Sequence, residues 1–191
     1  QIFDTRSTRG HLHQLQAHTG PVYALEWHPA LAGVLASGGR DKTIKVWSLE
    51  NITSGAAGTG APAAAAAGGV SHAHSVLTLG AVGRLRWRPG GGSEHQWHLA
   101  SCAGTADCQP HVWDVRRPAT ALYSIRGHRD VCCGLAFPGE PIGVAGDVLL
   151  SVSTASKEPR LLSHSLSALP APYAHASPVA LCWGPDDALV S

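Results

Sequence analysis

Apolar residues along this chain gather in short runs that are separated by glycine, proline and aspartate. Residues 22–27, 34–38 and 43–47 are clear examples, and polar and apolar residues alternate from Thr43 to Val46. Short alternating or apolar runs bounded by turn-forming residues are typical of β-strands. Outside one alanine-rich tract, no segment keeps apolar residues at helical spacing over several turns. The pattern therefore predicts an all-β protein.

The runs recur in the same order, so the chain contains a repeated unit. The first copy ends at Trp47 and the second at Trp113, whereas the third has His164 in the place of tryptophan. Residues 2–4 match the end of an earlier copy. Units of this size pack against their neighbours, because one unit alone cannot bury its apolar faces.

Several residues recur at fixed places in the unit. An aromatic residue closely followed by proline ends the inner strand of each copy, at Trp27, Trp87, Phe137 and Trp183. In three copies the turn before this strand holds a histidine, at His18, His128 and His175. A later turn holds Asp41 and Asp107, and Trp113-Asp114 closes the second copy. Together these features resemble the WD repeat (WD40), whose unit forms a four-stranded blade of a β-propeller.

The resemblance implies a partial WD40 β-propeller with about three full blades and parts of two others. We expect the end of a preceding blade at 1–4, blades at 5–50 and 70–117, a low-complexity linker at 51–69, a degenerate blade at 118–167 and the start of a further blade at 168–191. A propeller commonly has about seven blades of ~40–45 residues. The chain has 191 residues, begins with Gln1 and contains no methionine. We therefore expect blades to be missing on both sides.

In the family, a hydrogen-bonded chain of Trp, Ser, His and Asp supports each blade. The resemblance assigns these roles to Trp47, Ser37, His18 and Asp41 in the first copy. The second copy offers Ser101, Asp107 and Trp113 without a matching histidine, the third offers His128, a serine within 149–153, Glu158 near the turn and His164, and the fourth begins with His175. Because buried polar groups need partners, we expect the second and third blades to be less stable than the first.

Other functions find little support in the residues. Ser, His and Asp occur together, but there is no Gly-x-Ser-x-Gly motif, and the fold accounts for these residues without catalysis. The histidine pairs His11/His13 and His72/His74 lack a third metal ligand. The net charge of +1 gives no electrostatic case for nucleic-acid binding, and no apolar run is long enough to span a bilayer. We expect no enzyme activity, cofactor, metal, small-molecule substrate or direct membrane insertion.

The insertions relative to a minimal repeat all follow a first or third strand of the predicted blade. They lie at 51–69, 90–96 and 138–147. Because strands alternate in direction, these insertions are predicted to share one face of the propeller. The opposite face, which carries the histidine and aspartate turns, is the better candidate for a constant contact surface.

Several segments, in their order along the chain, resemble one particular group within the WD-repeat family. These are residues 36–42, 82–89, 98–102, 112–118 and 128–131. They resemble the WD-repeat subunits of the SEA/GATOR assembly, which regulates the TOR kinase in response to amino acids. The resemblance implies a non-catalytic scaffold with other subunits of a multi-propeller complex as partners. It also implies a cytoplasmic location, at the cytosolic face of the lysosome or vacuole. That family's C-terminal zinc domain, tied to ubiquitin-ligase activity, is expected outside this chain.

Two alternatives remain open at this stage. Residues 113–116 read Trp-Asp-Val-Arg, which resembles the Trp-Asp-x-Arg motif of substrate receptors on cullin ubiquitin ligases, with Arg116 and Arg117 as candidate partner contacts. A generic WD-repeat scaffold is the other. Separately, Arg84, Arg86 and Arg88 alternate along one predicted strand, so they share a side that meets either an acidic partner or an adjacent blade.

Overall fold

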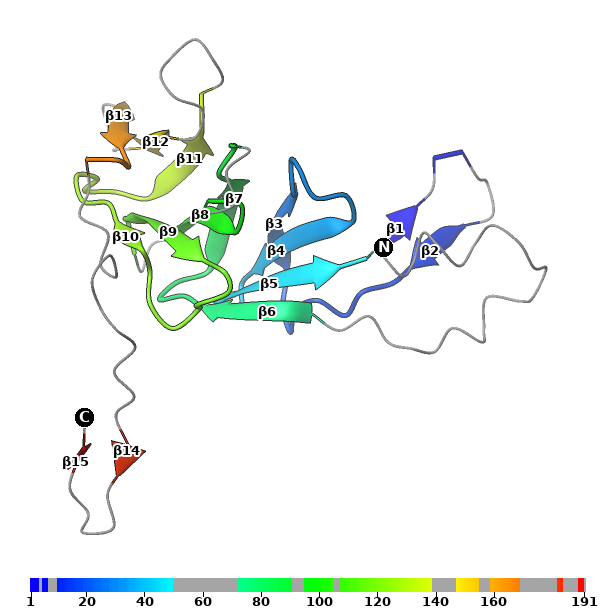
Figure 1. Ribbon diagram of the computed structural model, residues 1–191. Coiled ribbons are helices and arrows are strands. Elements are labelled where there is room, and N and C mark those ends of the chain that lie inside the picture. The colour runs from blue at the N-terminus through cyan, green and yellow to red at the C-terminus, as the bar shows by residue number, and fades with distance from the viewer. Residues whose placement is uncertain are drawn as a thin grey trace.

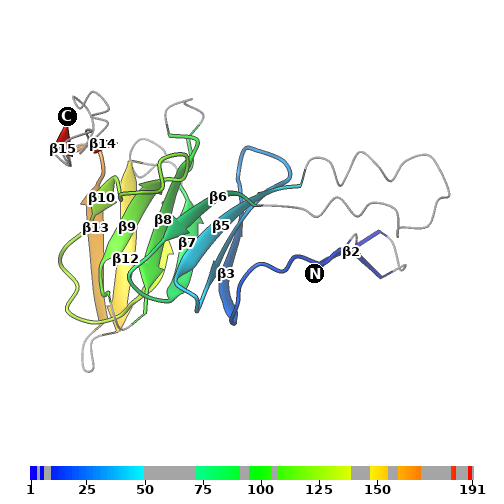
Figure 2. The ribbon, with the colours of Figure 1, turned by 90° about the horizontal axis from the view of Figure 1, so that it is seen from below.

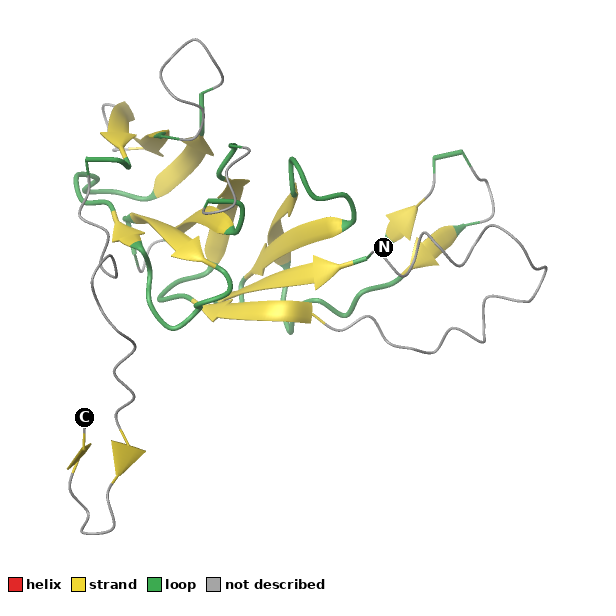
Figure 3. Ribbon diagram, in the orientation of Figure 1, coloured by secondary structure: helices red, strands yellow, loops and turns green. Residues whose placement is uncertain are grey.

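The computed structural model describes residues 1–3, 5–6, 10–49, 72–90, 95–104, 107–138, 147–154, 159–168, 182–183 and 189–190. Within these residues the regular structure is strand throughout and no helix occurs (Figure 3). The prediction of an all-β protein is confirmed. The predicted linker at 51–69, together with Glu158 and His175, lies outside the described residues.

Three antiparallel sheets form the body of the molecule (Figure 1). The first sheet contains β3 (Val22–Trp27), β4 (Val34–Gly39), β5 (Thr43–Ser48) and β6 (His72–Leu77). The second contains β7 (Val82–Trp87), β8 (His98–Ala103), β9 (Pro110–Asp114) and β10 (Tyr123–Ser124). The third contains β11 (Cys132–Ala136), β12 (Val148–Thr154) and β13 (Pro159–Ser165). Two further pairs join β1 (Ile2–Phe3) to β2 (His11–His13) and β14 (Cys182–Trp183) to β15 (Leu189–Val190).

Sheets and sequence repeats are offset by one strand. The outermost strand of the first sheet, β6, comes from the start of the next repeat, and β10 relates to the second sheet in the same way. β2, at the start of the first full repeat, likewise pairs with β1. At these three repeat boundaries, backbone hydrogen bonds therefore join neighbouring repeats, in addition to side-chain packing.

The sheets stack with their inner strands β3, β7 and β11 side by side (Figures 1 and 2). Side chains of a strand alternate between its two faces, so a sheet between two others contributes to two cores. One core joins the first and second sheets and includes Ile44, Val46, Leu85 and Leu99. A second core joins the second and third sheets and includes Val112, Ile125, Leu135 and Leu149.

Candidate functional site

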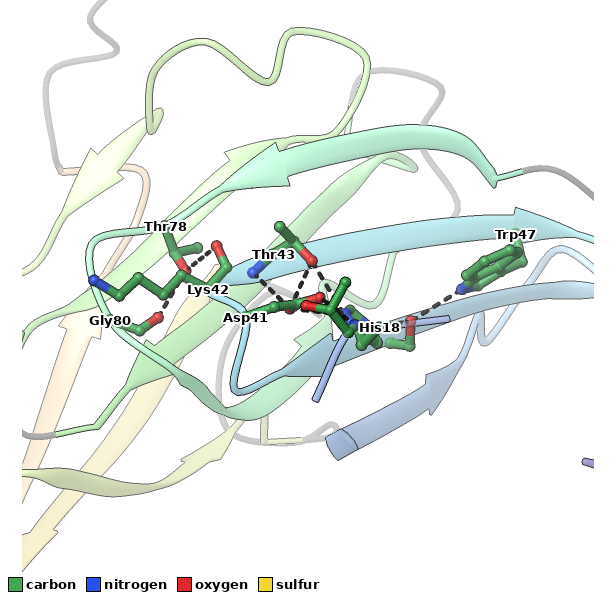
Figure 4. Close-up of polar contacts among 9 residues, drawn as sticks. His18, Asp41, Lys42, Thr43, Trp47, Thr78 and Gly80 are labelled. Atoms are coloured by element: carbon green, nitrogen blue, oxygen red, sulfur yellow. Dashed lines mark hydrogen bonds and ion pairs between the residues drawn. The ribbon is translucent and has the colours of Figure 1, made fainter. Parts of the chain in front are cut away.

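A continuous hydrogen-bonded chain crosses the first sheet (Figure 4). Trp47 Nε1 on β5 donates to Ser37 Oγ on β4 over 3.0 Å. The hydroxyl of Ser37 lies 2.8 Å from His18 Nε2, and His18 Nδ1 lies 2.9 Å from Asp41 Oδ1. If every member donates to the next, His18 carries its proton on Nδ1. The structure thus brings together all four residues predicted for the first copy.

Asp41 is the most heavily hydrogen-bonded member of this chain. Besides His18, it accepts from Thr19 N at 3.1 Å, Thr43 N at 3.2 Å and Thr43 Oγ1 at 2.8 Å. Burial raises the pKa of Asp41, but the hydrogen bonds from Thr43, His18 and Thr19 outweigh it and lower the pKa to about 2. The carboxylate is therefore charged at neutral pH, and it holds the β4–β5 turn against the segment that precedes β3.

Serine, histidine and aspartate stand here in the order of a hydrolase triad, but the serine cannot meet a substrate. Ser37 is 1% exposed, and its oxygen already accepts the Trp47 hydrogen bond. A nucleophile needs an accessible oxygen and space for the acyl group. The arrangement in the first sheet therefore supports the blade and gives no indication of catalysis.

The second sheet has the same Trp–Ser hydrogen bond, but its aspartate and a histidine form a separate pair. Trp113 faces Leu99 across the ladder as Trp47 faces Leu35, and its Nε1 donates to Ser101 Oγ over 2.8 Å. Asp107 does not reach this pair. It accepts from His111 Nε2 at 2.6 Å, and His111 Nδ1 lies 2.9 Å from Ser124 Oγ.

His111 is a network residue that the sequence analysis missed. It lies on β9 instead of in the turn before the inner strand, where the repeat pattern places the histidine. Its position four residues after Asp107 was the available signal, because a tight turn brings such residues together. The second sheet therefore satisfies its turn aspartate with a histidine of its own.

In the third sheet two imidazoles flank one serine. His128 Nε2 lies 2.6 Å and His164 Nε2 lies 2.9 Å from Ser151 Oγ. His164 faces Leu149 in the ladder, which is the register position of Trp47 and Trp113. His128 Nδ1 is buried and has no hydrogen-bond partner among the described residues. Burial lowers the pKa of both histidines, as does Arg160 near His128 and His128 near His164.

Arg116 has a partner within its own turn. Its Nε and Nη2 lie 3.0 and 2.9 Å from the two carboxylate oxygens of Asp114, and its backbone N donates to Oδ1 over 3.0 Å. Burial raises the pKa of Asp114, but the Arg116 hydrogen bonds outweigh it and the pKa is lowered. The Arg116 side chain is still 45% exposed, and Arg117 is also exposed.

The arginine stripe consists of Arg84 and Arg86 on β7 and Arg88 directly after it, and two of these side chains contact adjacent sheets. Arg86 pairs with Glu26 of the first sheet, and the buried Arg88 lies 2.8 Å from Asp147 just before β12 of the third sheet. Arg84 is exposed. Two of the three arginines thus link the second sheet to its neighbours.

The described part of the chain contains no group of three or more His, Cys, Asp or Glu residues placed to hold a metal ion. The same described residues contain no long apolar helix of the kind that crosses a membrane.

The family model for the WD domain, G-beta repeat, matches residues 9–48. This segment runs from the strand before His18 to the end of β5, so it contains the complete Trp47–Asp41 network. Together with the stacked antiparallel sheets, the match shows that the chain belongs to the WD40-repeat family.

Within that family the chain is similar to proteins named GATOR2 complex protein WDR24. The human protein is 36% identical over 186 residues, which is 96% of this chain and 20% of the relative. The Dictyostelium discoideum protein is 32% identical over 178 residues, 93% of this chain and 14% of the relative. The Drosophila melanogaster protein is 38% identical over 143 residues, 75% of this chain and 15% of the relative. The chain thus spans between 14% and 20% of the length of these relatives.

Proposed function

We propose that this chain is a non-catalytic protein-interaction scaffold, the propeller part of a subunit of a GATOR2-type complex. The observation that carries the proposal is the similarity over 96% of the chain to a protein named as a member of that complex. The proposal includes a role in the response of the TOR kinase to amino acids. It also includes a cytoplasmic location at the cytosolic face of the lysosome or vacuole, and other propeller subunits as partners.

The geometry supports a scaffold because polar groups that resemble catalytic ones are used internally. Ser37, His18 and Asp41 bond to one another, and Trp47 closes the chain. Rigid turns held by such networks present exposed side chains in fixed positions, which suits recognition of other proteins.

A substrate receptor of a cullin ubiquitin ligase is the second candidate, on the Trp-Asp-x-Arg pattern of residues 113–116. The bidentate contact with Asp114 gives Arg116 a structural role that explains its presence without a partner. This observation weighs against docking through Arg116. A generic WD-repeat scaffold is what remains if neither complex is found.

The experiment is a pull-down of the full-length protein from its own cells, followed by identification of the recovered proteins. We expect other large propeller-containing subunits, and we expect TOR output to respond abnormally to amino-acid withdrawal when the protein is removed. Recovery of a cullin and its adaptor, abolished by Arg116→Ala, would establish the receptor function instead.

A further inference from the structure

Two leucines near the end of β6 are among the most exposed apolar residues of the described chain. Leu77 is 73% exposed and Leu79 is 74% exposed. Single exposed leucines are common on protein surfaces, so exposure alone identifies nothing. These two are notable for their place in the fold, which is beside the turn that the Asp41 network holds.

The leucines are held firmly against that turn. Leu77 faces Thr43 across the β5–β6 ladder. Between the two leucines, Thr78 donates from both its backbone N and its Oγ1 to the carbonyl oxygen of Lys42, each over 2.9 Å (Figure 4). The segment that carries Leu77 and Leu79 is therefore fixed to the β4–β5 turn.

The same turn exposes two cations. Arg40 and Lys42 are both exposed, and neither side chain has an ion-pair partner among the residues that the structure describes. Asp41 lies between them but points inward to His18 and Thr43. A hollow of about 360 Å³ lies at this turn, and it is lined by Thr19, Gly20, Pro21, Arg40 and Asp41.

We propose that Arg40, Lys42, Leu77, Leu79 and this hollow form a docking surface for an acidic segment of a partner protein that also carries apolar side chains. The proposal rests on the proposed function in so far as it requires a protein partner. We call these four residues and the hollow the Lys42 surface.

The turn aspartates and the exposed cations near the Lys42 surface together favour an acidic partner. Asp41, Asp107 and Asp130 all lie in turns, and each accepts hydrogen bonds from its own chain, as Asp130 does from Val131 N over 2.7 Å. A basic partner would therefore find Asp41 and Asp107 with both carboxylate oxygens already hydrogen-bonded. A carboxylate would find the exposed donors of Arg40 and Lys42. Apolar contacts beside complementary charge are the usual composition of a protein interface.

A membrane and a nucleic acid fit the Lys42 surface less well. Stable electrostatic binding to anionic lipid takes a cluster of about four to eight basic residues. Nucleic-acid binding needs many phosphate contacts, and the chain as a whole has a net charge of only +1. Two leucines, two cations and a hollow match the scale of one peptide segment.

The test uses the full-length protein in its own cells, with a photo-crosslinking amino acid in place of Leu79 or, as a second site, of the exposed Ala30 in the β3–β4 connection. The crosslinked segment is sequenced by mass spectrometry. We expect an acidic segment with apolar residues at position 79 and a different segment, or none, at position 30. A crosslink to lipid, to nucleic acid or to a basic segment at position 79 overturns the proposal, as does the absence of any crosslink there.

Charge reversal gives a second readout. Arg40→Glu with Lys42→Glu should reduce recovery of the crosslinked partner at least about tenfold, because like charges then face each other. Lysine substitutions in the partner's acidic segment should restore binding. Arg129→Glu, an exposed cation in the turn before β11, is the matched control and should leave recovery unchanged. Leu79→Ser should weaken binding while leaving the melting temperature unchanged, since Leu79 is exposed.

The two proposals fail separately in this design. If the pull-down recovers GATOR2-type subunits and their recovery is indifferent to the Arg40 and Lys42 reversals, the Lys42 surface is wrong and the proposed function stands. If the pull-down recovers no GATOR2-type subunit, while an acidic apolar segment of another protein crosslinks at position 79 and charge reversal abolishes that crosslink, the surface stands and the proposed function is wrong.

Discussion

At the scale of single residues, each of the three sheets has a buried serine that is hydrogen-bonded to a ring nitrogen, and the sheets differ in the other residues of the network. The tryptophan–serine hydrogen bond occurs in the first and second sheets, and His164 takes the place of the tryptophan in the third. Only the first sheet, among those described, continues the chain through a histidine to an aspartate. An unpaired buried polar group costs free energy. The stability of each sheet therefore depends on whether the residue at the end of its hydrogen-bonded chain has hydrogen-bond partners.

Asp41→Ala should destabilise the full-length propeller by about 1–3 kcal/mol, because it removes the acceptor of His18, Thr19 and Thr43. Asp107→Ala should cost less, because Asp107 accepts only from His111 and Gln109 among the described residues and the Trp113–Ser101 bond does not depend on it. Thermal melting of both variants measures the difference. Equal decreases in melting temperature would mean that the Asp41 network is no stronger than the Asp107 pair.

The free energy of unfolding should decrease as the pH falls from about 6.5 to about 4. Burial, together with Arg88 and His95, lowers the pKa of His98 from 6.5 to about 4, so the folded protein keeps it neutral where the unfolded chain binds a proton. Stability therefore rises with pH across this window, by at most about 1.4 kcal/mol per pH unit for one such group.

Urea unfolding at several pH values measures this dependence. His98→Gln should make it shallower, because the variant has no group that titrates at this position. His128 and His164, whose pKa values are also lowered, should supply the remaining slope. An unchanged slope in the His98 variant would show that His98 is accessible to protons in the folded state.

At the scale of the elements, position within the sheet decides which residues a strand can use. β4 and β8 are buried along their whole length, because each is an inner strand of its sheet and is covered on both faces. β8 lies between the first and third sheets, whereas β4 packs on the second sheet and, through Leu35, on a cluster that includes Leu15 and Ala17. Both strands carry small residues, with Ala36, Ser37 and Gly38 in one and Ala100, Ser101 and Cys102 in the other. Small side chains let the adjacent sheets approach closely while the serine remains free to bond to its tryptophan.

Deleting Thr53 to Gly69 should leave the propeller folded. Trp47 on β5 and His72 on β6 are directly opposite in the ladder, so the connection between these strands starts and ends at neighbouring points. The cost of closing a loop changes slowly with its length, so the free energy of unfolding should change by less than about 1 kcal/mol. A large fall in melting temperature in the deletion variant would mean that the removed segment packs on the sheets.

At the scale of the whole molecule, the sheets are held in a stack by direct contacts between layers. The first and second sheets approach closely at Gly38 on β4, where an added Cβ would lie 2.4 Å from Cγ1 and 2.8 Å from Cβ of Val82 on β7. Arg86 to Glu26 and Arg88 to Asp147 add ion pairs between adjacent sheets. Stacking therefore depends on steric fit at a few points, and charge pairs reinforce it.

Gly38→Ala should destabilise the full-length protein by about 1–3 kcal/mol, because the first and second sheets must move apart to accommodate the methyl group. Gly83→Ala on β7 is the matched control: its added Cβ would meet nothing closer than the Cys102 carbonyl oxygen at 3.7 Å. Chemical denaturation compares the two. Equal stability of both variants would show that the Gly38 contact relaxes without cost.

Much of the architecture was predictable because its signals are local. The short apolar runs indicated strands, the recurring His18, Asp41 and Trp47 indicated the repeat, and the resemblance to the WD repeat assigned these three residues to one network. The one-strand offset between sheets and repeats was harder to see, since a repeat starts equally well at any of its strands. His111 was missed because it takes the role of the turn histidine from a different position in the unit.

The sequence by itself determined the class of fold, because strand periodicity and turn residues act over a few positions, and its resemblance to the WD repeat supplied the makeup of the first network. Only the tertiary structure decided between the two alternatives for two of the three arginines in the stripe. It directed Arg86 to Glu26 and Arg88 to Asp147, residues about 60 positions away. It also placed Leu77 and Leu79 beside Arg40 and Lys42. Such contacts depend on the register of strands and the stacking of sheets, which no short stretch of sequence specifies.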